Sequence, residues 1–304
     1  DNTVWCLAFS PNGDLYAGGA FTTAGGTTVN NIAKWDGTSW SALGTGLTNI
    51  ARCLAIAPNG DLYAGGYFTT AGGNSANYIA KWDGTSWSAL DTGMNNVVWS
   101  LAIAPNGNLY AGGDFTTANG DSANYIAKWN GTSWSPLGSG ISNIVYSLAE
   151  YNGELIAGGL FLSAGGVSAK SIAKWNGSTW SPLGSGITGS IYQYVFGLAV
   201  LNNELYAGGL YETAGGVVAN GIAKWNGSVW SALGSGLYYG GSNAYGAFAV
   251  NTYGNDLIVG GLFTTAGGVG VAHVAKYGLP SITTLNVTVM PEGFYNPVSN
   301  TLNM

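Results

Sequence analysis

The chain has little charge, one arginine, one histidine and two cysteines. Only 7% of its 304 residues are charged, eight are lysine or arginine, and the net charge is −6. Proteins that bind nucleic acids hold the phosphates with many basic residues, so we expect no nucleic-acid partner. Cys6 and Cys53 are too few for a disulfide framework, and His273 alone cannot build a histidine metal site. We therefore expect no metal and no cofactor.

Long apolar runs are also missing, and no stretch approaches the length of a membrane span. The first residues, DNTVWC, do not read as a signal peptide, and we expect one to have been removed or to lie outside this chain. Hydrophobic residues nevertheless make up 46% of the sequence and aromatic residues 13%. This composition excludes a disordered chain and allows a substantial core.

One unit is repeated six times. The marker YAGG begins at Tyr16, Tyr63, Tyr110 and Tyr206, with degenerate copies at Ile156 and Ile258, and the spacings are 47, 47, 46, 50 and 52 residues. A second marker is the hexapeptide WDGTSW, which spans 35–40 and returns with small changes at 82–87, 129–134, 175–180 and 225–230. Such a period is typical of propellers and solenoids.

The first unit contains four strand candidates, at 4–10, 14–21, 31–35 and 40–44. The turn signals PNG and DGTS join the first to the second and the third to the fourth, and a loop is expected at 24–30. Four short antiparallel strands in each ~47-residue repeat predict an all-β fold, a six-bladed β-propeller. The expected propeller covers 1–286, with blades at about 3–46, 49–93, 96–140, 143–186, 193–236 and 245–286.

The last unit and the tail depart from the pattern. YGLPSI at 277–282 has the spacing of WDGTSW, so we expect the sixth fourth strand at 281–286 with both indoles replaced. The segment 287–304 has no repeat marker. We expect it to be a tail or the start of a following C-terminal β-module.

The strand ending in Gly-Gly, the aromatic strand, the tight turn and the tryptophan strand together resemble the kelch repeat. The longer pattern AGGxFTTAGGxxxNxIAKWDGTSWSALGTGL is similar to kelch-like repeats of large secreted bacterial proteins of the Bacteroidota type. The resemblance covers about 3–286 and implies a propeller in a secreted or surface protein. The two aromatics lie closer together than in the usual kelch repeat, and the family spans enzymes and scaffolds, so the resemblance implies no activity.

Two repeated features have structural explanations. Each repeat lysine follows an acidic partner at the start of the second strand in five of six units, which predicts a cross-strand ion pair in each blade. Cys6 and Cys53 occupy equivalent positions, so they should point the same way and remain free, buried thiols. The hexapeptide itself reads as a hairpin whose indoles pack between blades.

Candidate ligand-binding residues lie in two links that are longer than the others and rich in tyrosine. Both belong to the end of the blades where loops vary, which is where function concentrates on a rigid scaffold. The candidates are Tyr192, Tyr194, Tyr238, Tyr239 and Tyr245. Exposed rings beside polar groups suit contacts with sugars or proteins, although these rings could also only fill the space of longer loops.

A second set of large side chains begins the first strand of each unit: Trp5, Arg52, Trp99, Tyr146 and Phe196. They either line a central channel or wedge between blades, and packing is the favoured interpretation.

Catalysis has little support in the sequence. DGTSW is reminiscent of a box in sialidase-type propellers, but those enzymes need an arginine cluster, and a kelch-like copper oxidase needs more than one histidine. A glycosidase could use paired carboxylates among Glu150, Glu154, Glu204 and Glu212. We predict no catalytic residues and no enzyme.

The predicted function is a non-catalytic binding or structural module of a larger secreted or surface protein. Its expected partners are proteins or glycans at the cell surface or in the extracellular matrix. The alternative is a lectin-like propeller, since PNGDLY and the period are similar to a five-bladed propeller that binds GlcNAc. A polysaccharide-processing enzyme is the third reading.

Overall fold

The computed structural model describes residues 1–190, 193–240, 246–278, 281–283, 295–296 and 301–302. They form strands and turns only, and they contain no helix of the length and apolarity that a membrane crossing requires. The chain divides into two compact units, Asp1–Leu137 with Met290–Met304, and Gly138–Val289. Each unit holds three of the six main sheets.

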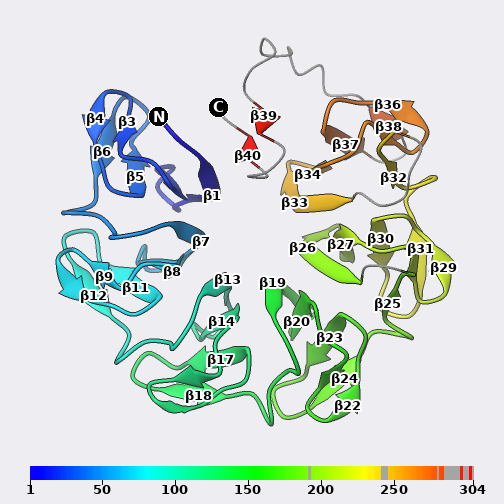
Figure 1. Ribbon diagram of the computed structural model, residues 1–304, viewed down its shortest axis with the longest axis horizontal. Helices are drawn as coiled ribbons and strands as arrows, with labels where there is room; N and C mark the ends of the chain where they lie inside the picture. Colours follow the sequence, from blue (N-terminus) through cyan, green and yellow to red (C-terminus); the bar gives the residue numbers. More distant parts are fainter. Residues whose placement is uncertain (191–192, 241–245, 279–280, 284–294, 297–300, 303–304) are drawn as a thin grey trace. The chain divides into compact units, whose positions relative to one another are not determined.

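Each main sheet has four antiparallel strands in chain order (Figure 1). The first strands are β1 (Val4–Phe9), β7 (Ala51–Ile56), β13 (Val98–Ile103), β19 (Val145–Tyr151), β26 (Tyr194–Leu201) and β33 (Ala247–Tyr253). The second strands are β2 (Leu15–Gly19), β8 (Leu62–Gly66), β14 (Leu109–Gly113), β20 (Glu154–Gly159), β27 (Glu204–Leu210) and β34 (Asp256–Gly261). The third strands are β5 (Ile32–Trp35), β11 (Ile79–Trp82), β17 (Ile126–Trp129), β23 (Ile172–Trp175), β30 (Ile222–Trp225) and β37 (Val274–Gly278). The fourth strands are β6 (Trp40–Ala42), β12 (Trp87–Ala89), β18 (Trp134–Pro136), β24 (Trp180–Pro182), β31 (Trp230–Ala232) and β38 (Ser281–Thr283).

These six sheets confirm the predicted fold class, a six-bladed all-β propeller with four antiparallel strands per blade. Inside each unit the first strands of neighbouring sheets lie side by side: β1, β7 and β13 in one, and β19, β26 and β33 in the other. The predicted sixth fourth strand is confirmed over Ser281–Thr283, where Ile282 pairs with Tyr277, and its residues 284–286 lie outside the described part.

The loop between the second and third strands is not the plain loop that the sequence predicted. It forms a small hairpin in every sheet, made of β3 (Thr23–Ala24) and β4 (Thr27–Thr28), β9 (Thr70–Ala71) and β10 (Asn74–Ser75), β15 (Thr117–Ala118) and β16 (Asp121–Ser122), β21 (Ser163–Ala164) and β22 (Val167–Ser168), β28 (Thr213–Ala214) and β29 (Val217–Val218), and β35 (Thr265–Ala266) and β36 (Val269–Gly270). Two residues with positive φ turn each hairpin, so a two-residue turn replaces the expected loop. Both are glycines in five sheets, as with Gly25 at 54° and Gly26 at 82°, and they are Asn119 and Gly120 in the third.

The links between sheets add to these hairpins. In the two long links, β25 (Ile187–Thr188) pairs with β28, and β32 (Leu237–Tyr238) pairs with β35. The shorter links make single bridges, for example from Leu47 to Ala71. The links and the hairpins therefore lie at the same end of each sheet, and the tight turns at the other. The short pair β39 (Tyr295–Asn296) and β40 (Thr301–Leu302) belongs to the tail.

The tryptophan hairpins join neighbouring sheets, as the sequence predicted. In each hexapeptide the two indoles pair across the turn, with ring centroids 5.3–5.5 Å apart. The second indole then reaches the preceding sheet: Nε1 of Trp87 donates to the carbonyl of Leu43 at 2.8 Å, and Nε1 of Trp230 to that of Leu183 at 3.0 Å. The core lies between sheets for this reason, around fully buried side chains such as Phe68 and Phe115.

The predicted lysine–acid pairs are present in five sheets. They join Lys34 to Asp14, Lys81 to Asp61, Lys174 to Glu154, Lys224 to Glu204 and Lys276 to Asp256, with nitrogen–oxygen distances of 2.6–3.2 Å. In the third sheet the start of the second strand is Asn108, as the sequence anticipated. Cys6 and Cys53 are both free, also as predicted, although Cys6 is only half-buried.

Candidate ligand-binding site

A β-bulge interrupts the first strand of every main sheet. The pairing with the second strand shifts by one residue at the same place each time, so one residue of the first strand has no partner. These residues are Trp5, Arg52, Trp99, Tyr146, Phe196 and Phe248. A bulge changes the direction of the side chain that it carries, and bulges are over-represented next to functional sites.

The Gly-Gly pair of the second strand makes the bulge possible. A Cβ on Gly19 would overlap the carbonyl oxygen of Thr3, and one on Gly18 would lie 2.7 Å from Sγ of Cys6. The bulged backbone therefore presses on the second strand where a side chain is absent. Because the first strand begins beside a link, all six bulges lie at the end where the loops vary.

In the first unit the bulge residues form a stack of cation and aromatic rings. Cζ of Arg52 lies 3.8 Å from the ring centroid of Trp5 and 4.5 Å from that of Trp99. Tyr67 packs edge-on against Trp99, with centroids 5.7 Å apart and planes at 82°. All four side chains are partly exposed. An aromatic face attracts a guanidinium, so the two indoles hold the arginine in place.

The electrostatics of this cluster are unusual for so acidic a chain. Burial lowers the pKa of Arg52, which nevertheless remains charged because guanidinium is a very weak acid. Burial also raises the pKa of Cys6 to about 12, so the thiol remains neutral. Among the described residues, no carboxylate forms an ion pair with Arg52. Asp114, whose charge acts on Tyr67, accepts a hydrogen bond from Nδ2 of Asn96 at 3.0 Å.

In the second unit the equivalent positions carry a purely aromatic cluster. Phe196 is its centre: it lies 5.1 Å from Tyr146 and 5.4 Å from Phe248, and it stacks on Tyr194 at 5.5 Å with an interplanar angle of 8°. Each of the four rings is partly exposed. They come from three neighbouring first strands, so the bulges assemble a continuous aromatic surface.

The structure separates the predicted tyrosines. Tyr194 is a strand residue and belongs to the aromatic cluster of Phe196. Tyr238 lies in β32, and its hydroxyl accepts a hydrogen bond from Nδ2 of Asn220 at 2.6 Å. Tyr239 is 37% exposed, and its ring centroid lies 6.4 Å from that of His273. Tyr192 and Tyr245 lie outside the described residues.

The sequence did not point to two of these residues, Phe248 in the cluster of the second unit and Tyr67 in that of the first. Phe248 is found by extending the bulge position to the sixth repeat, where AFAVN replaces the VWCLA-type strand start. Tyr67 follows the Gly-Gly pair, where other repeats have Ala20, Asp114 or leucine, so its role is visible only from the packing.

Each of the carboxylates considered for a glycosidase is held by another group. Glu154 and Glu204 are in lysine pairs at 2.8 Å. Glu150 accepts a hydrogen bond from the backbone of Gly153 in a tight turn, whereas Glu212 contacts Ser190 at the link end. In the part of the chain that the structure describes, no cluster of three or more His, Cys, Asp or Glu side chains is placed to hold a metal ion.

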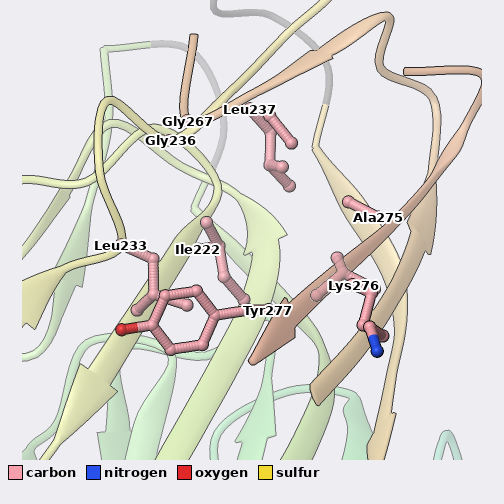
Figure 2. A pocket seen from close by; sticks show the side chains of 10 residues that line it. Ile222, Leu233, Gly236, Leu237, Gly267, Ala275, Lys276 and Tyr277 are labelled. Carbon is pink, nitrogen blue, oxygen red and sulfur yellow. The ribbon is translucent and has the colours of Figure 1, made fainter. Parts of the chain in front are cut away.

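One cavity of about 20 Å³ lies between the fifth and sixth sheets (Figure 2). Leu233 and Tyr277 line it together with Ile222 and Ala275. Tyr277 stands where the first tryptophan of the hexapeptide stands in the other five repeats. A space of this size has room for about one water, and its lining is apolar, so it is a packing defect rather than a ligand site.

Comparison with known families supports a β-propeller repeat protein. A family model described as a domain of unknown function (DUF5122) beta-propeller matches residues 57–81 and 104–131. The first segment begins just after β7 and ends within β11, in the second repeat. The other begins just after β13 and ends in the turn that follows β17, in the third repeat. No curated protein matches the sequence.

Solved structures with similar folds come from dissimilar proteins. The extracellular domain of the putative one component system BT4673 from B. thetaiotaomicron is 13% identical with a TM-score of 0.55, and the match covers 86% of this chain and 32% of that one. The computationally designed Ika8 protein is 17% identical with a TM-score of 0.51, and 90% and 80% are covered. Virginiamycin B lyase from Staphylococcus aureus is 13% identical with a TM-score of 0.52, and 92% and 85% are covered. At these identities the likeness shows the fold alone.

Proposed function

We propose that this chain is a non-catalytic binding module of a secreted or cell-surface protein, and that it contacts glycans through its bulge residues. The observation that carries the proposal is the aromatic cluster of Tyr146, Tyr194, Phe196 and Phe248. Large rings that remain partly exposed and adjoin one another are typical of surfaces that bind sugars or proteins.

A purely structural role explains the cluster less well. The hydrogen-bond ladder of each sheet passes around the bulge residue, so that side chain is not needed for strand pairing. The blades are already joined by the tryptophan hairpins, whose second indoles are 5–9% exposed from the second to the fifth sheet. The rings at the bulges therefore add apolar surface that the fold does not require.

An extracellular location is part of the proposal. One solved structure of similar fold is the extracellular domain of a putative one component system, and the match covers only 32% of that chain. The kelch-like pattern of large secreted bacterial proteins also favours a module within a longer protein. We propose that the chain is not a catalyst because each of the carboxylates considered for a glycosidase is engaged in an ion pair or a hydrogen bond.

A glycan array probed with the whole chain tests the proposal. We expect binding of at least one glycan class, and we expect Tyr194→Ala and Phe196→Ala each to weaken it at least about tenfold, since stacking on a ring contributes about 1–3 kcal/mol. Tyr253→Ala is the matched control, because Tyr253 is 78% exposed and lies at the opposite end of a first strand.

Two results would contradict the proposal. If no glycan on the array binds, glycans are not the ligand. If Tyr253→Ala weakens glycan binding as much as Phe196→Ala does, the aromatic cluster is not the binding site. Turnover of a polysaccharide by the purified chain would overturn the non-catalytic assignment.

A further inference from the structure

The Arg52 cluster of the first unit has hydrogen-bond donors without acceptors. The guanidinium has five N–H groups, and among the described residues none of them has an acceptor. Nε1 of Trp5 is buried and also has no acceptor there. Buried polar groups in native structures are usually hydrogen-bonded, so the Trp5 N–H is an unsatisfied donor. Arg52 is half-buried and none of its nitrogens is among the buried atoms without a partner, so its N–H groups are open to a ligand that supplies oxygen acceptors.

We propose that Trp5, Arg52 and Trp99 form a binding site for the carboxylate group of an acidic sugar, such as a uronate. The inference rests on the proposed glycan-binding function and names the ligand class of a different cluster. It concerns the first unit only, whereas the aromatic cluster that carries the proposed function lies in the second.

The stack fixes the direction from which a ligand approaches. The two indoles face the guanidinium at 3.8 and 4.5 Å, so the faces of the cation are covered. Its N–H groups lie in its own plane and point out between the rings. A carboxylate that enters in this plane accepts two parallel hydrogen bonds, which is the geometry that arginine prefers.

The charge of the site favours a single carboxylate over a polyanion. Arg52 is one positive charge in a chain with a net charge of −6, and five of the seven lysines are in ion pairs. A monoanion neutralises the partly buried cation, whereas a phosphate chain or nucleic acid would bring uncompensated negative charge.

The surroundings favour a sugar over the free carboxylate of a peptide. Trp99 and Tyr67 present partly exposed rings, and such rings stack on the apolar face of a pyranose. The carboxylate of Asp114, held by Asn96, is an acceptor for sugar hydroxyl groups near Tyr67.

Isothermal titration of the whole chain with methyl galacturonoside, a monoanion, and with its methyl ester tests the inference, because the two probes differ only at the carboxyl group. We expect the acid to bind at least about tenfold more tightly than the ester. Arg52→Met, which keeps the apolar stem, should remove this difference. Arg52→Lys should retain part of it, since lysine keeps the charge but loses the planar fork.

Lys128→Met is the matched control, since Lys128 is a lysine for which no ion pair is found in the described residues and it lies on the third strand of the same unit. It should leave the preference for the acid unchanged. Thermal unfolding of each variant shows that it is folded, and Arg52→Lys keeps the cation between the indoles if the methionine variant is too unstable to measure.

Three outcomes would overturn the inference. The ester binds as tightly as the acid, or Arg52→Met and Arg52→Lys both leave the preference unchanged, or a short peptide with a free carboxyl terminus binds and methyl galacturonoside does not. If neutral glycans bind through Tyr194 and Phe196 while methyl galacturonoside does not bind, this inference fails alone. If no glycan binds, the proposed function fails with it.

Discussion

At the scale of single residues, Asp36 shows how the tight turns are held. Its Oδ1 accepts hydrogen bonds from the backbone N–H groups of Thr38 and Ser39, both at 2.8 Å, and from the Thr38 hydroxyl at 2.7 Å. These bonds hold the pKa of the Asp36 carboxyl well below its ordinary value, and the same is true of Asp83. In the next three sheets Asn130, Asn176 and Asn226 make the backbone bonds without charge.

This difference predicts a pH dependence. Because the folded pKa lies below the unfolded one, the two aspartates stabilise the fold above about pH 4, and this contribution is lost as the pH falls further. The double variant Asp36→Asn and Asp83→Asn should therefore lose less stability than the wild type between about pH 4 and pH 2. Thermal unfolding measured across this range checks the result.

The reverse change is the control for this experiment. Asn130→Asp should make the chain more sensitive to acid in the same range. If the difference in unfolding temperature between the wild type and the double variant does not change with pH, these carboxylates do not contribute in the expected way.

Gly65 gives a second prediction at this scale. A Cβ at this position would lie 2.7 Å from Sγ of Cys53 and 2.7 Å from Cγ1 of Val98 in the next sheet. Gly65→Ala should therefore destabilise the fold by about 1–3 kcal/mol, the usual cost of overpacking. Gly270→Ala is the matched control, since nothing lies within 4 Å of its added Cβ and its φ is not positive. Equal thermal stability of the two variants would refute the close-approach explanation of Gly-Gly.

At the scale of elements, the tryptophan hairpin is the connection between neighbouring sheets. Trp87→Phe retains a ring but removes the N–H that donates to the Leu43 carbonyl, which then keeps only its hydrogen bond from the backbone N–H of Gly46. We expect a loss of about 1 kcal/mol in the free energy of unfolding, the usual net contribution of one hydrogen bond, measured with urea. Trp40→Phe should cost less because that indole is only half-buried. A larger loss for Trp40→Phe would contradict this explanation of the hexapeptide.

The strands were predictable because local residues determine them. Turn residues such as those of WDGTSW mark the ends of strands, and because the pattern is repeated, each strand assignment can be checked in the other repeats. The bulges and small hairpins were not predictable, because a bulge is defined by its partner strand and a two-residue strand has no periodicity.

The candidate site was only partly predictable for the same reason. Long tyrosine-rich links drew attention to Tyr194, and the repeat placed Arg52 among the residues that begin the first strands. That Arg52 lies between two indoles, without an acid partner in the described residues, follows from packing between three sheets. Sequence spacing within one repeat cannot show a contact of this kind.

At the scale of the whole molecule, the charge distribution limits the partners. The sequence has a pI of about 4.5, and most of its lysines are already paired with acids. We expect no detectable binding of duplex DNA at about 0.15 M salt in a fluorescence polarisation assay. A salt-sensitive complex with DNA would show that basic surface has been underestimated, and it would also weaken the case for a monoanionic ligand at Arg52.

Most strand residues must pair with a neighbouring strand and also present a side chain, whereas a bulge residue only presents a side chain. Tryptophan, arginine, tyrosine and phenylalanine occupy one position of otherwise similar repeats, because that position makes no ladder pair. Each repeat can therefore exchange this side chain while its sheet stays the same. Six interchangeable positions on one chain would let duplication and point mutation compose new recognition surfaces, and they offer a natural set of sites for a designed library.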